Sequence, residues 1–579
     1  MKIAMSALSA SLLLLVVACS AQQSESAQGA VESDQEDIVL ETAEDIARPN
    51  IVLVLFEDMS PRVGSFGDPL AVTPNWDRIA SEGIKYTNVF TTSGVCAPSR
   101  AALITGHYQQ TIGAQHMRTT GASGLPGGGP QNYLAVPGPE VKAFPELLRS
   151  AGYYTSNDSK TDYQFGEPFT IWDQSGEEAD WSGRSDDQPF FHMQTLFDTH
   201  ESATWPIDMA VTNPIEAFIV QRNTTVFADR AERVAPEEVT VPPYLPDTQD
   251  VRRDIATHYN NIAFTDMALG ELYDRLEAEG LLDETILIIS TDHGDGLPRM
   301  KRSLYDSGLN VPMVIRYPDR RGAGTQNEEL ISFIDLAPII LSWAETEAPQ
   351  GLHGLDLIGV DREPERQYVF AAQDRMDGEM NHQRAVRDER FKYIRNYIEG
   401  DPFFEPLAFR DSQPSMQALW AGRDAGTLPP AAAALFEPLP EEQLYDTDTD
   451  PHEVNNLADD PAYQADLLRL RGALSDWMDE VGDMSSLPEA DMIETMWPGG
   501  EQPMTQAVNG DISSLESGYK VVLTSPTEGA SIGYKFDEGA EHWQLYNGPL
   551  IVEAGSVLTA KAVRYGYAES AETTVNVPE

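Results

Sequence analysis

Two unbroken apolar runs constrain the fold of this 579-residue chain more than any other feature of its sequence. They occupy residues 49 to 56 and 285 to 290, and both are rich in valine, isoleucine and leucine. An unbroken run of this length, rather than an alternating one, is typical of a parallel strand that is buried on both faces. Helices cover such sheets on both sides, so the sequence predicts an α/β fold.

Ligand-capable side chains follow both runs. Glu57 and Asp58 come directly after the first, and Asp292 and His293 follow the second. Open α/β sheets bind ligands beyond the carboxyl ends of their strands, and carboxylates there favour a bound metal ion. For the first pair alone, two solvated turn acids explain the pattern equally well. The recurrence of the pattern after two buried strands favours the metal site.

Residues 91 to 106, between the two runs, predict a loop that enters a helix. Pro98 is tolerated in a first helical turn, residues 101 to 104 are good helix formers, and Gly106 suits a C-terminal cap. Cys96 therefore lies at a helix N-terminus, where backbone N–H groups and the helix dipole favour an anion or an ionised thiol. A free cysteine is more often a small buried apolar residue. The polar, turn-rich surroundings of Cys96 argue against that alternative.

The same residues carry a family resemblance. Cys96-x-Pro98-x-Arg100, followed by Ala-Ala-Leu-x-Thr-Gly, resembles the signature of type I sulfatases of the alkaline phosphatase superfamily. In that family a formylglycine-generating enzyme or an anaerobic sulfatase-maturating enzyme converts the cysteine to formylglycine after synthesis. Residues 57 to 61 and 301 to 312 are most similar to the heparan N-sulfatase-like branch. The resemblance implies a large mixed, mostly parallel sheet sandwiched by helices, with a smaller C-terminal α+β subdomain.

The resemblance implies one divalent metal ion as a cofactor, together with formylglycine at position 96. Its expected ligands are Glu57, Asp58, Cys96, Asp292 and His293. Glu57 stands where most members have Asp, and His293 stands where most have Asn. Ca²⁺ is the expected ion. Because calcium prefers oxygen ligands while imidazole suits manganese, zinc or iron, His293 leaves Mn²⁺ or another metal open.

The resemblance also assigns the catalytic residues, which are Cys96, Arg100, Lys160, His200 and Lys301. One hydroxyl of hydrated formylglycine is expected to attack sulfur in line, and the second then expels sulfate. The three basic residues neutralise the sulfate or orient the hydrate. His200 protonates the departing alcohol, since imidazole changes charge near neutral pH. An exposed turn is the alternative explanation for Lys160.

Four further residues are predicted to contact the substrate, namely His116, Arg118, Asp162 and Arg375. A surface loop is the alternative for His116 and Arg118, and solvated surface is an equal alternative for Arg375. Asp162 occupies the position of the histidine in the family's Lys-x-His, and it cannot be assumed to take over that role. His192, eight residues before His200, is expected to be a packed core histidine.

Charge and the N-terminal residues bear on partners and location. With 93 acidic and 39 basic residues the formal charge is −54, which argues against a nucleic-acid partner and favours a marine or halophilic source. Residues 1 to 18 resemble a lipoprotein signal peptide, with lipidation of Cys19; an ordinary signal peptide is the alternative. Residues 19 to 47 predict a disordered acidic tether. We expect a bacterial cell-envelope lipoprotein, periplasmic or on the outer membrane, that contacts the membrane only through its lipid anchor.

The rest of the chain is predicted to form three parts. Residues 48 to 482 are the expected catalytic domain, with its C-terminal subdomain from about residue 345, and residues 483 to 517 are the expected linker. Residues 518 to 579 alternate and turn like an immunoglobulin-like β-sandwich, and they resemble the C-terminal module of chitobiases and β-hexosaminidases. Trp543 and Tyr546 are candidates for stacking on sugar, although core packing is the commoner role of such aromatics.

Together these features predict an enzyme, a sulfuric ester hydrolase that removes sulfate from a sulfated polysaccharide or oligosaccharide. His293 motivates an alternative within the superfamily, a phosphonate or phosphate ester hydrolase. Glu57 and Asp162 motivate an alternative from another class, a non-catalytic lipoprotein that binds glycans.

Overall fold

A computed structural model describes residues 48–120, 131–360, 362–536 and 542–579 of the protein. The predicted signal peptide, the acidic tether and Cys19 lie outside these residues. No helix in the described part of the chain is both long and apolar enough to cross a membrane. The described residues belong to one compact unit.

A mixed sheet of nine strands lies at the centre of the fold, in the order β4-β3-β5-β1-β6-β7-β2-β8 with β9 also beside β2. Among the described strands of this sheet, β7 alone runs antiparallel to its neighbours. The prediction of a mixed, mostly parallel sheet is therefore confirmed. The strands are β1 (Asn50–Phe56), β2 (Ile84–Phe90), β3 (Tyr154–Asp158), β4 (Gln174–Ser175), β5 (Phe190–Leu196), β6 (Thr285–Thr291), β7 (Asn310–Arg316), β8 (Gln326–Asn327) and β9 (Ile331–Ser332).

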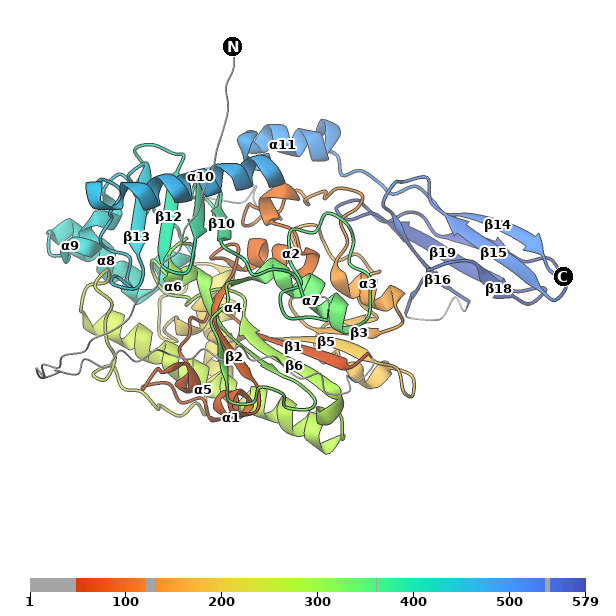
Figure 1. Cartoon of the computed structure of the whole chain (residues 1–579), viewed down its shortest axis with the longest axis horizontal. Helices are drawn as coiled ribbons and strands as arrows, with labels where there is room; N and C mark the ends of the chain where they lie inside the picture. Colours follow the sequence, from red (N-terminus) through yellow and green to blue (C-terminus); the bar gives the residue numbers. More distant parts are fainter. Residues whose placement is uncertain (1–47, 121–130, 361, 537–541) are drawn as a thin grey trace, which may run out of the picture. The chain divides into compact units, whose positions relative to one another are not determined.

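Different helices cover the two faces of this sheet (Figure 1). Alternate side chains of β1 enter two separate apolar clusters, one with Ile51, Leu53 and Leu55 and the other with Val52, Val54 and Phe56. The covering helices are α2 (Cys96–Thr105), α3 (Phe144–Ser150) and α7 (Leu336–Trp343) on the first face, and α1 (Pro74–Glu82) and α5 (Gln249–Ala278) on the second. Burial on both faces explains why the run in β1 is unbroken.

A second, antiparallel sheet follows the central one, in the order β10-β11-β12-β13. Helix α10 covers it, because Leu470 and Trp477 share an apolar cluster with Tyr393 and Leu444 of the sheet. The same cluster includes Ala102 of α2, so this region packs directly against the helix that Cys96 begins. The elements of this region are β10 (Val369–Gln373), β11 (Gln383–Arg387), β12 (Phe391–Asn396), β13 (Glu442–Asp446), α8 (Pro414–Ala425), α9 (Pro430–Ala433) and α10 (Gln464–Val481). Two further helices lie earlier in the chain, α4 (Pro214–Val226) before β6 and α6 (Asp306–Leu309) after it.

Two small antiparallel sheets end the chain, one in the order β14-β15-β18 and the other in the order β17-β16-β19-β20. Val521 of the first sheet and Leu558 and Ala560 of the second share one apolar cluster, as expected for a β-sandwich. The strands are β14 (Asn509–Ser514), β15 (Tyr519–Thr524), β16 (Ser531–Lys535), β17 (Gln544–Leu545), β18 (Leu550–Val552), β19 (Val557–Val563) and β20 (Thr573–Asn576).

The predicted linker at residues 483 to 517 contains regular structure. It includes helix α11 (Glu489–Met496) and strand β14, which pairs with β15 along its whole length. The sandwich therefore begins at Asn509 rather than at residue 518. The sequence did not indicate this strand because its side chains are mostly polar and exposed, so it has no apolar alternation.

The loop before α2 packs closely against the chain after Lys301. The N–H of Arg302 donates to the carbonyl oxygen of Gly94 at 2.7 Å, and a Cβ added to Gly94 would lie 2.3 Å from the carbonyl oxygen of Ser303. Both atoms belong to backbone, which cannot move aside as a flexible side chain would. Only glycine therefore allows these two segments to approach so closely.

The substitution Gly94→Ala is expected to lower the free energy of unfolding by about 1 to 3 kcal/mol, the usual cost of overpacking. Gly472→Ala is the matched control, since Gly472 lies within α10 and its Cβ would meet open space. There, alanine is expected to stabilise by about 0.5 to 1 kcal/mol through its higher helix propensity. Denaturant unfolding of both variants checks this, and equal effects would contradict the close-packing argument.

Candidate active site

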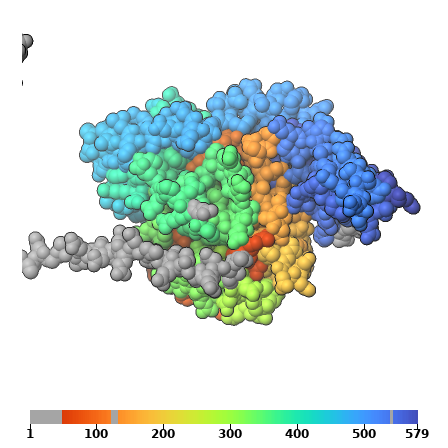
Figure 2. All heavy atoms as spheres, turned by 45° about the vertical axis from the view of Figure 1, so that its right-hand side comes forward, coloured from red at the N-terminus to blue at the C-terminus, as the bar shows by residue number. Residues whose placement is uncertain are grey.

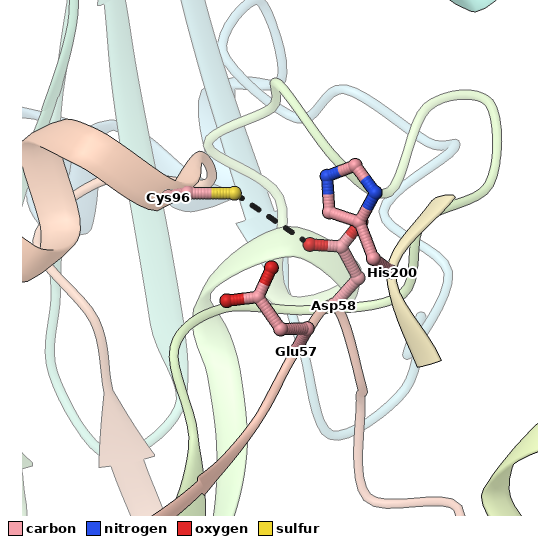
Figure 3. A group of neighbouring side chains, drawn as sticks. All are labelled: Glu57, Asp58, Cys96 and His200. Carbon is pink, nitrogen blue, oxygen red and sulfur yellow. Dashed lines mark hydrogen bonds between the residues drawn. The ribbon is translucent and has the colours of Figure 1, made fainter. Parts of the chain in front are cut away.

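Cys96 is the first residue of α2 and is 1% exposed, so the predicted position at a helix N-terminus is confirmed. Its Sγ lies 3.3 Å from His293 Nε2, 3.4 Å from Lys301 Nζ and 3.7 Å from Asp58 Oδ1. Figure 3 shows Cys96 pointing from the start of the helix toward Asp58, with Glu57 and His200 beside that carboxylate. The thiol thus faces acidic and basic groups rather than an apolar core.

The two acid-bearing strand ends meet because β1 and β6 are paired in parallel, with Phe56 opposite Thr291. The pairing continues past the strands, since the N–H of Asp58 donates to Asp292 Oδ1 at 3.0 Å. Asp58 adopts the left-handed region, with φ 47°, which is uncommon for a residue other than glycine. The juxtaposition predicted from the two apolar runs is therefore present.

The donor set fits a divalent metal ion. The ligand atoms of Asp58, Cys96, Asp292 and His293 all lie within 4.8 Å of one another, and so do those of Glu57, Asp58, Cys96 and His200. The Nδ1 of His293 lies 2.9 Å from the carbonyl oxygen of Gly294, an arrangement that places the proton on Nδ1. Nε2, which lies 3.0 Å from Asp58 Oδ1, is then the nitrogen that would bind the metal, as in most histidine metal sites. Buried carboxylates beside such an imidazole match the expected chemistry of the site.

Three cations compensate the buried carboxylates. Arg100 donates to Glu57 at 2.6 Å and to Asp292 at 3.1 Å, and its remaining nitrogen contacts Thr195. Lys160 Nζ lies 2.7 Å from Glu57 Oε2. Each of the three nitrogens of the buried Arg100 guanidinium donates one of these hydrogen bonds, so Arg100 orients Glu57 and Asp292 relative to each other.

Lys301 is the third cation, and its Nζ lies 2.7 Å from Asp58 Oδ2. Burial opposes charge on Lys301, but Asp58, Cys96 and Glu201 outweigh it and raise the pKa of the ammonium. Burial likewise opposes charge on Asp58, and Lys301 is the largest of the influences that hold the pKa of this carboxyl well below its ordinary value. Both groups are therefore charged at neutral pH.

His200 follows β5, and its Nε2 lies 3.3 Å from Lys301 Nζ. Burial and, next, the charge of Lys301 lower the pKa of His200 to about 3, so the imidazole is neutral in this arrangement. Phe197 stacks on the ring, with the centroids 4.8 Å apart. Additional negative charge beside His200 would be needed to raise its pKa and protonate the imidazole.

The four predicted substrate contacts divide into two pairs. The Arg118 side chain is 43% exposed, and Asp162 Oδ2 lies 3.7 Å from Lys160 Nζ, so both remain accessible beside the cluster. His116 and Arg375 are buried, and the N–H of Arg375 donates to His116 Nδ1 at 3.3 Å. The Arg375 guanidinium is bound by both oxygens of Glu489 and by backbone carbonyls of Met117 and Asp377. The structure therefore shows internal partners for Arg375, and its contact with substrate stays a prediction.

Glu201 and Arg302 belong to the site but were not among the predicted residues. Arg302 donates to both oxygens of Glu201 at 2.8 Å, and Glu201 also lies 3.1 Å from Lys301 Nζ. The N–H of Glu201 donates to Asp58 Oδ2 at 2.7 Å. Glu201 directly follows His200, and Arg302 directly follows Lys301. The opposite charges of Glu201 and Arg302 were the sequence signal that could have indicated their pairing. His192, in contrast, is buried beside Ser156 as predicted.

Comparison with known protein families and sequences gives consistent matches. The family model described as Sulfatase matches residues 49–346, and the model described as N-sulphoglucosamine sulphohydrolase, C-terminal, matches residues 299–416. A Formosa agariphila protein named ulvan-active sulfatase is 41% identical over 549 residues, which cover 90% of each chain. N-sulphoglucosamine sulphohydrolase of Homo sapiens is 26% identical, over 76% of this chain and 91% of its own.

Solved structures share the fold. One, a complex with D-glucosamine-2-N,6-O-disulfate, has a TM-score of 0.53 at 18% identity and covers 75% of this chain and 98% of its own. The phosphonate monoester hydrolase of Agrobacterium radiobacter has a TM-score of 0.51 at 18% identity, covering 75% of this chain and 96% of its own. At these identities the likeness shows the fold and does not decide the reaction.

Replacing the imidazole ligand is expected to change the metal preference of the site. In His293→Asn, an oxygen ligand replaces nitrogen, so retention of Mn²⁺ relative to Ca²⁺ is expected to fall on the order of tenfold. Elemental analysis after dialysis against each ion measures the ratio. His192→Asn is the control, because His192 lies buried on β5 and contacts Ser156 instead of the cluster. An unchanged ratio in His293→Asn would exclude His293 as a ligand.

Proposed function

The chain belongs to the sulfatase family, and on that premise we propose that it removes sulfate from a sulfated polysaccharide through a formylglycine formed from Cys96. The observation that carries the proposal is the position of Cys96. It begins a helix, and it lies within 3.7 Å of an acid, an imidazole and an ammonium group that have the chemistry of a metal and sulfate site. A sulfate ester carries a negative charge on the group under attack and hydrolyses slowly in water, so an oriented nucleophile and positive charge are both required.

Residue 96 supplies the nucleophile in this proposal. As a hydrate, formylglycine offers one hydroxyl to attack sulfur and a second to release sulfate and restore the aldehyde. A plain serine or cysteine lacks this second route. A divalent ion held by Glu57, Asp58, Asp292 and His293 would add positive charge beside the sulfate oxygens.

In this proposal Lys160 and Lys301 bind the sulfate group, and His200 donates a proton to the leaving oxygen. Lys301 lies 3.4 Å from the Sγ of residue 96, and Lys160 approaches from the more accessible side, on the far side of Glu57. A bound sulfate ester would contact the ammonium groups of Lys160 and Lys301 while these remain paired with Glu57 and Asp58. Its negative charge raises the proton affinity of His200, which then protonates the leaving oxygen.

The substrate class is proposed from the relatives. The Formosa agariphila relative, which covers nine tenths of this chain, is by name active on ulvan, and the human relative is by name an N-sulphoglucosamine sulphohydrolase. We therefore propose a sulfated polysaccharide as the substrate, with ulvan as the first candidate. Accessible Arg118 and Asp162 beside the cluster support contacts to the sugar on this side of the site.

A phosphonate or phosphate ester hydrolase remains the second candidate, and the position of His293 motivates it. The imidazole lies 3.0 Å from Asp58 Oδ1, where it would bring nitrogen to the metal. The shared fold with a phosphonate monoester hydrolase is compatible with this reading but distant in sequence. Relative turnover of an aryl sulfate and an aryl phosphonate by the same preparation distinguishes the two, and a large phosphonate preference would overturn the sulfatase proposal.

Sulfate release tests the proposed function. We expect the protein, coexpressed with a formylglycine-generating enzyme, to release sulfate from ulvan or another member of a panel of sulfated polysaccharides, measured by ion chromatography. Cys96→Ala is expected to lower the rate by at least about 10³-fold, because it removes the nucleophile. No sulfate release from any polysaccharide or aryl sulfate, by protein with confirmed formylglycine, would reject the proposal.

We further propose that the mature protein is a cell-envelope lipoprotein attached through Cys19. The apolar run before Cys19 and the acidic stretch after it support this location. Mass spectrometry of protein from a native or matched bacterial host is expected to show a lipidated N-terminal Cys19 and a peptide in which residue 96 is formylglycine. An unmodified Cys96 in all molecules would contradict the proposed maturation, and a chain that retains residues 1 to 18 would contradict the anchor.

A further inference from the structure

One residue of the C-terminal sandwich is part of the core of the catalytic region. Tyr565 follows β19, is 2% exposed, and shares an apolar cluster with Ile51 and Leu53 of the central sheet. Its ring stacks on Phe165 with the centroids 5.0 Å apart and an interplanar angle of 11°. Its hydroxyl donates to Glu146 Oε2 at 3.0 Å. The sandwich is therefore joined to the catalytic region by a buried aromatic and a buried hydrogen bond.

The next residue of the sandwich holds the backbone of the same segment. The N–H of Gly566 donates to the carbonyl oxygen of Phe165 at 3.1 Å. Gly566 has a φ of 79°, and a Cβ there would lie 2.1 Å from the carbonyl oxygen of Ala135. The N–H of Ala135 in turn donates to the carbonyl oxygen of Gln164 at 2.9 Å. The Tyr565–Gly566 turn thus packs closely against two neighbouring loop segments, one at Ala135 and one at Phe165.

These loops lead directly to the substrate side of the site. Lys160 and Asp162 lie a few residues before Phe165 in the same segment. Gln164 accepts a hydrogen bond from the hydroxyl of Thr119 at 2.8 Å, and its amide donates to the carbonyl oxygen of His116. It therefore ties the segment after Lys160 to the loop that carries Arg118. A shift of Phe165 would move both groups of proposed substrate contacts.

A second set of contacts fixes the sandwich close to this segment. The buried Glu146 accepts hydrogen bonds from the hydroxyls of Thr170 and Ser531 as well as from Tyr565. Arg149 donates to the carbonyl oxygen of Trp543 at 2.7 Å. Figure 2 shows the blue C-terminal part of the chain lying against an orange part of the catalytic region.

Trp543 itself faces this junction. Its ring lies 5.6 Å from that of Phe169, and the ammonium of Lys561 lies over both rings. The packing role that was the commoner alternative for this tryptophan therefore has direct partners in Phe169 and Lys561. The contacts of the sandwich are directed at the catalytic region.

We propose that the C-terminal sandwich positions the substrate-binding loops, with Tyr565 and Gly566 as positioning residues for the segment that carries Lys160 and Asp162. This role rests on the proposed sulfatase function for its kinetic consequence. Among residues 509–536 and 542–579, the described part of the sandwich, no hydrogen bond or ion pair reaches Cys96 or the metal-type cluster, so the proposed effect is on the fit of the sulfated substrate. Loss of the fit weakens substrate binding while leaving the nucleophile and its metal ligands in place.

Two glycine variants separate positioning from general destabilisation. Gly566→Ala and Gly555→Ala both place alanine at a positive φ within the sandwich, so both introduce similar backbone strain. A Cβ at Gly555 meets open space, whereas one at Gly566 meets the Ala135 carbonyl. With an aryl sulfate as the probe, Gly566→Ala is expected to raise KM about tenfold with kcat changed less than about twofold. Gly555→Ala is expected to keep the KM of the unchanged protein.

Two substitutions of Tyr565 separate the role of its ring from the role of its hydroxyl. Tyr565→Phe keeps the stack on Phe165 and loses only the hydroxyl, so its KM is expected to stay within about twofold of the unchanged protein, while Tyr565→Ala raises KM as Gly566→Ala does. Folded, formylglycine-containing variants with the KM of the unchanged protein would overturn the positioning role. If the unchanged protein hydrolyses no sulfate ester, the proposed function fails instead.

Hydrogen–deuterium exchange tests the positioning role without any activity. Gly566→Ala and Tyr565→Ala are expected to increase exchange in the peptide that spans residues 160 to 167, and Gly555→Ala is expected to leave it unchanged. An equal increase in all three variants would show general loosening and overturn the proposal. No increase in any of them would overturn it as well.

Discussion

Buried negative charge at the carboxyl ends of β1 and β6 is the constraint on which the rest of the site depends. Glu57, Asp58 and Asp292 have no exposed surface, and such carboxylates remain ionised only where cations and hydrogen bonds compensate them. The cations come from three separate places: Arg100 from α2, Lys160 from the segment after β3, and Lys301 from the loop after β6. The need to compensate these carboxylates therefore keeps the elements around Cys96 close together. Two of the cations, the ammonium groups of Lys160 and Lys301, lie where the proposed anionic substrate would bind.

The three departures from the common sulfatase pattern, Glu57, Asp162 and His293, fit within this arrangement of paired carboxylates and cations. The longer side chain of Glu57 reaches both Lys160 and Arg100, so the additional methylene does not leave either cation without a partner. His293 is fixed through Nδ1 by the Gly294 carbonyl, which aims Nε2 into the cluster. Asp162 stands on the accessible side of Lys160, where a carboxylate can adjust the position of that ammonium.

The sequence predicted the parts of the fold that depend on burial and chain connectivity. Unbroken apolar runs located β1 and β6, and the carboxyl-end rule for α/β sheets predicted that Asp58 and Asp292 lie at the same edge of the sheet. It did not predict which charged residues pair internally, because a pair such as Arg375 and Glu489 is formed by tertiary contact between distant segments. Nor did it indicate β14, whose stability comes from pairing with β15 rather than from its own side chains.

The burial of Tyr565 also determines when, relative to synthesis of the chain, the central apolar cluster can be completed. Domains tend to fold from the N-terminal side as the chain leaves the ribosome. Here, the central apolar cluster receives a residue from near the end of the chain, so that cluster is not complete until synthesis is nearly finished. Cys96 is 1% exposed once the fold is closed, so the proposed conversion to formylglycine would act on the chain before closure. A core completed so late leaves the nascent chain a longer period in which residue 96 is still accessible.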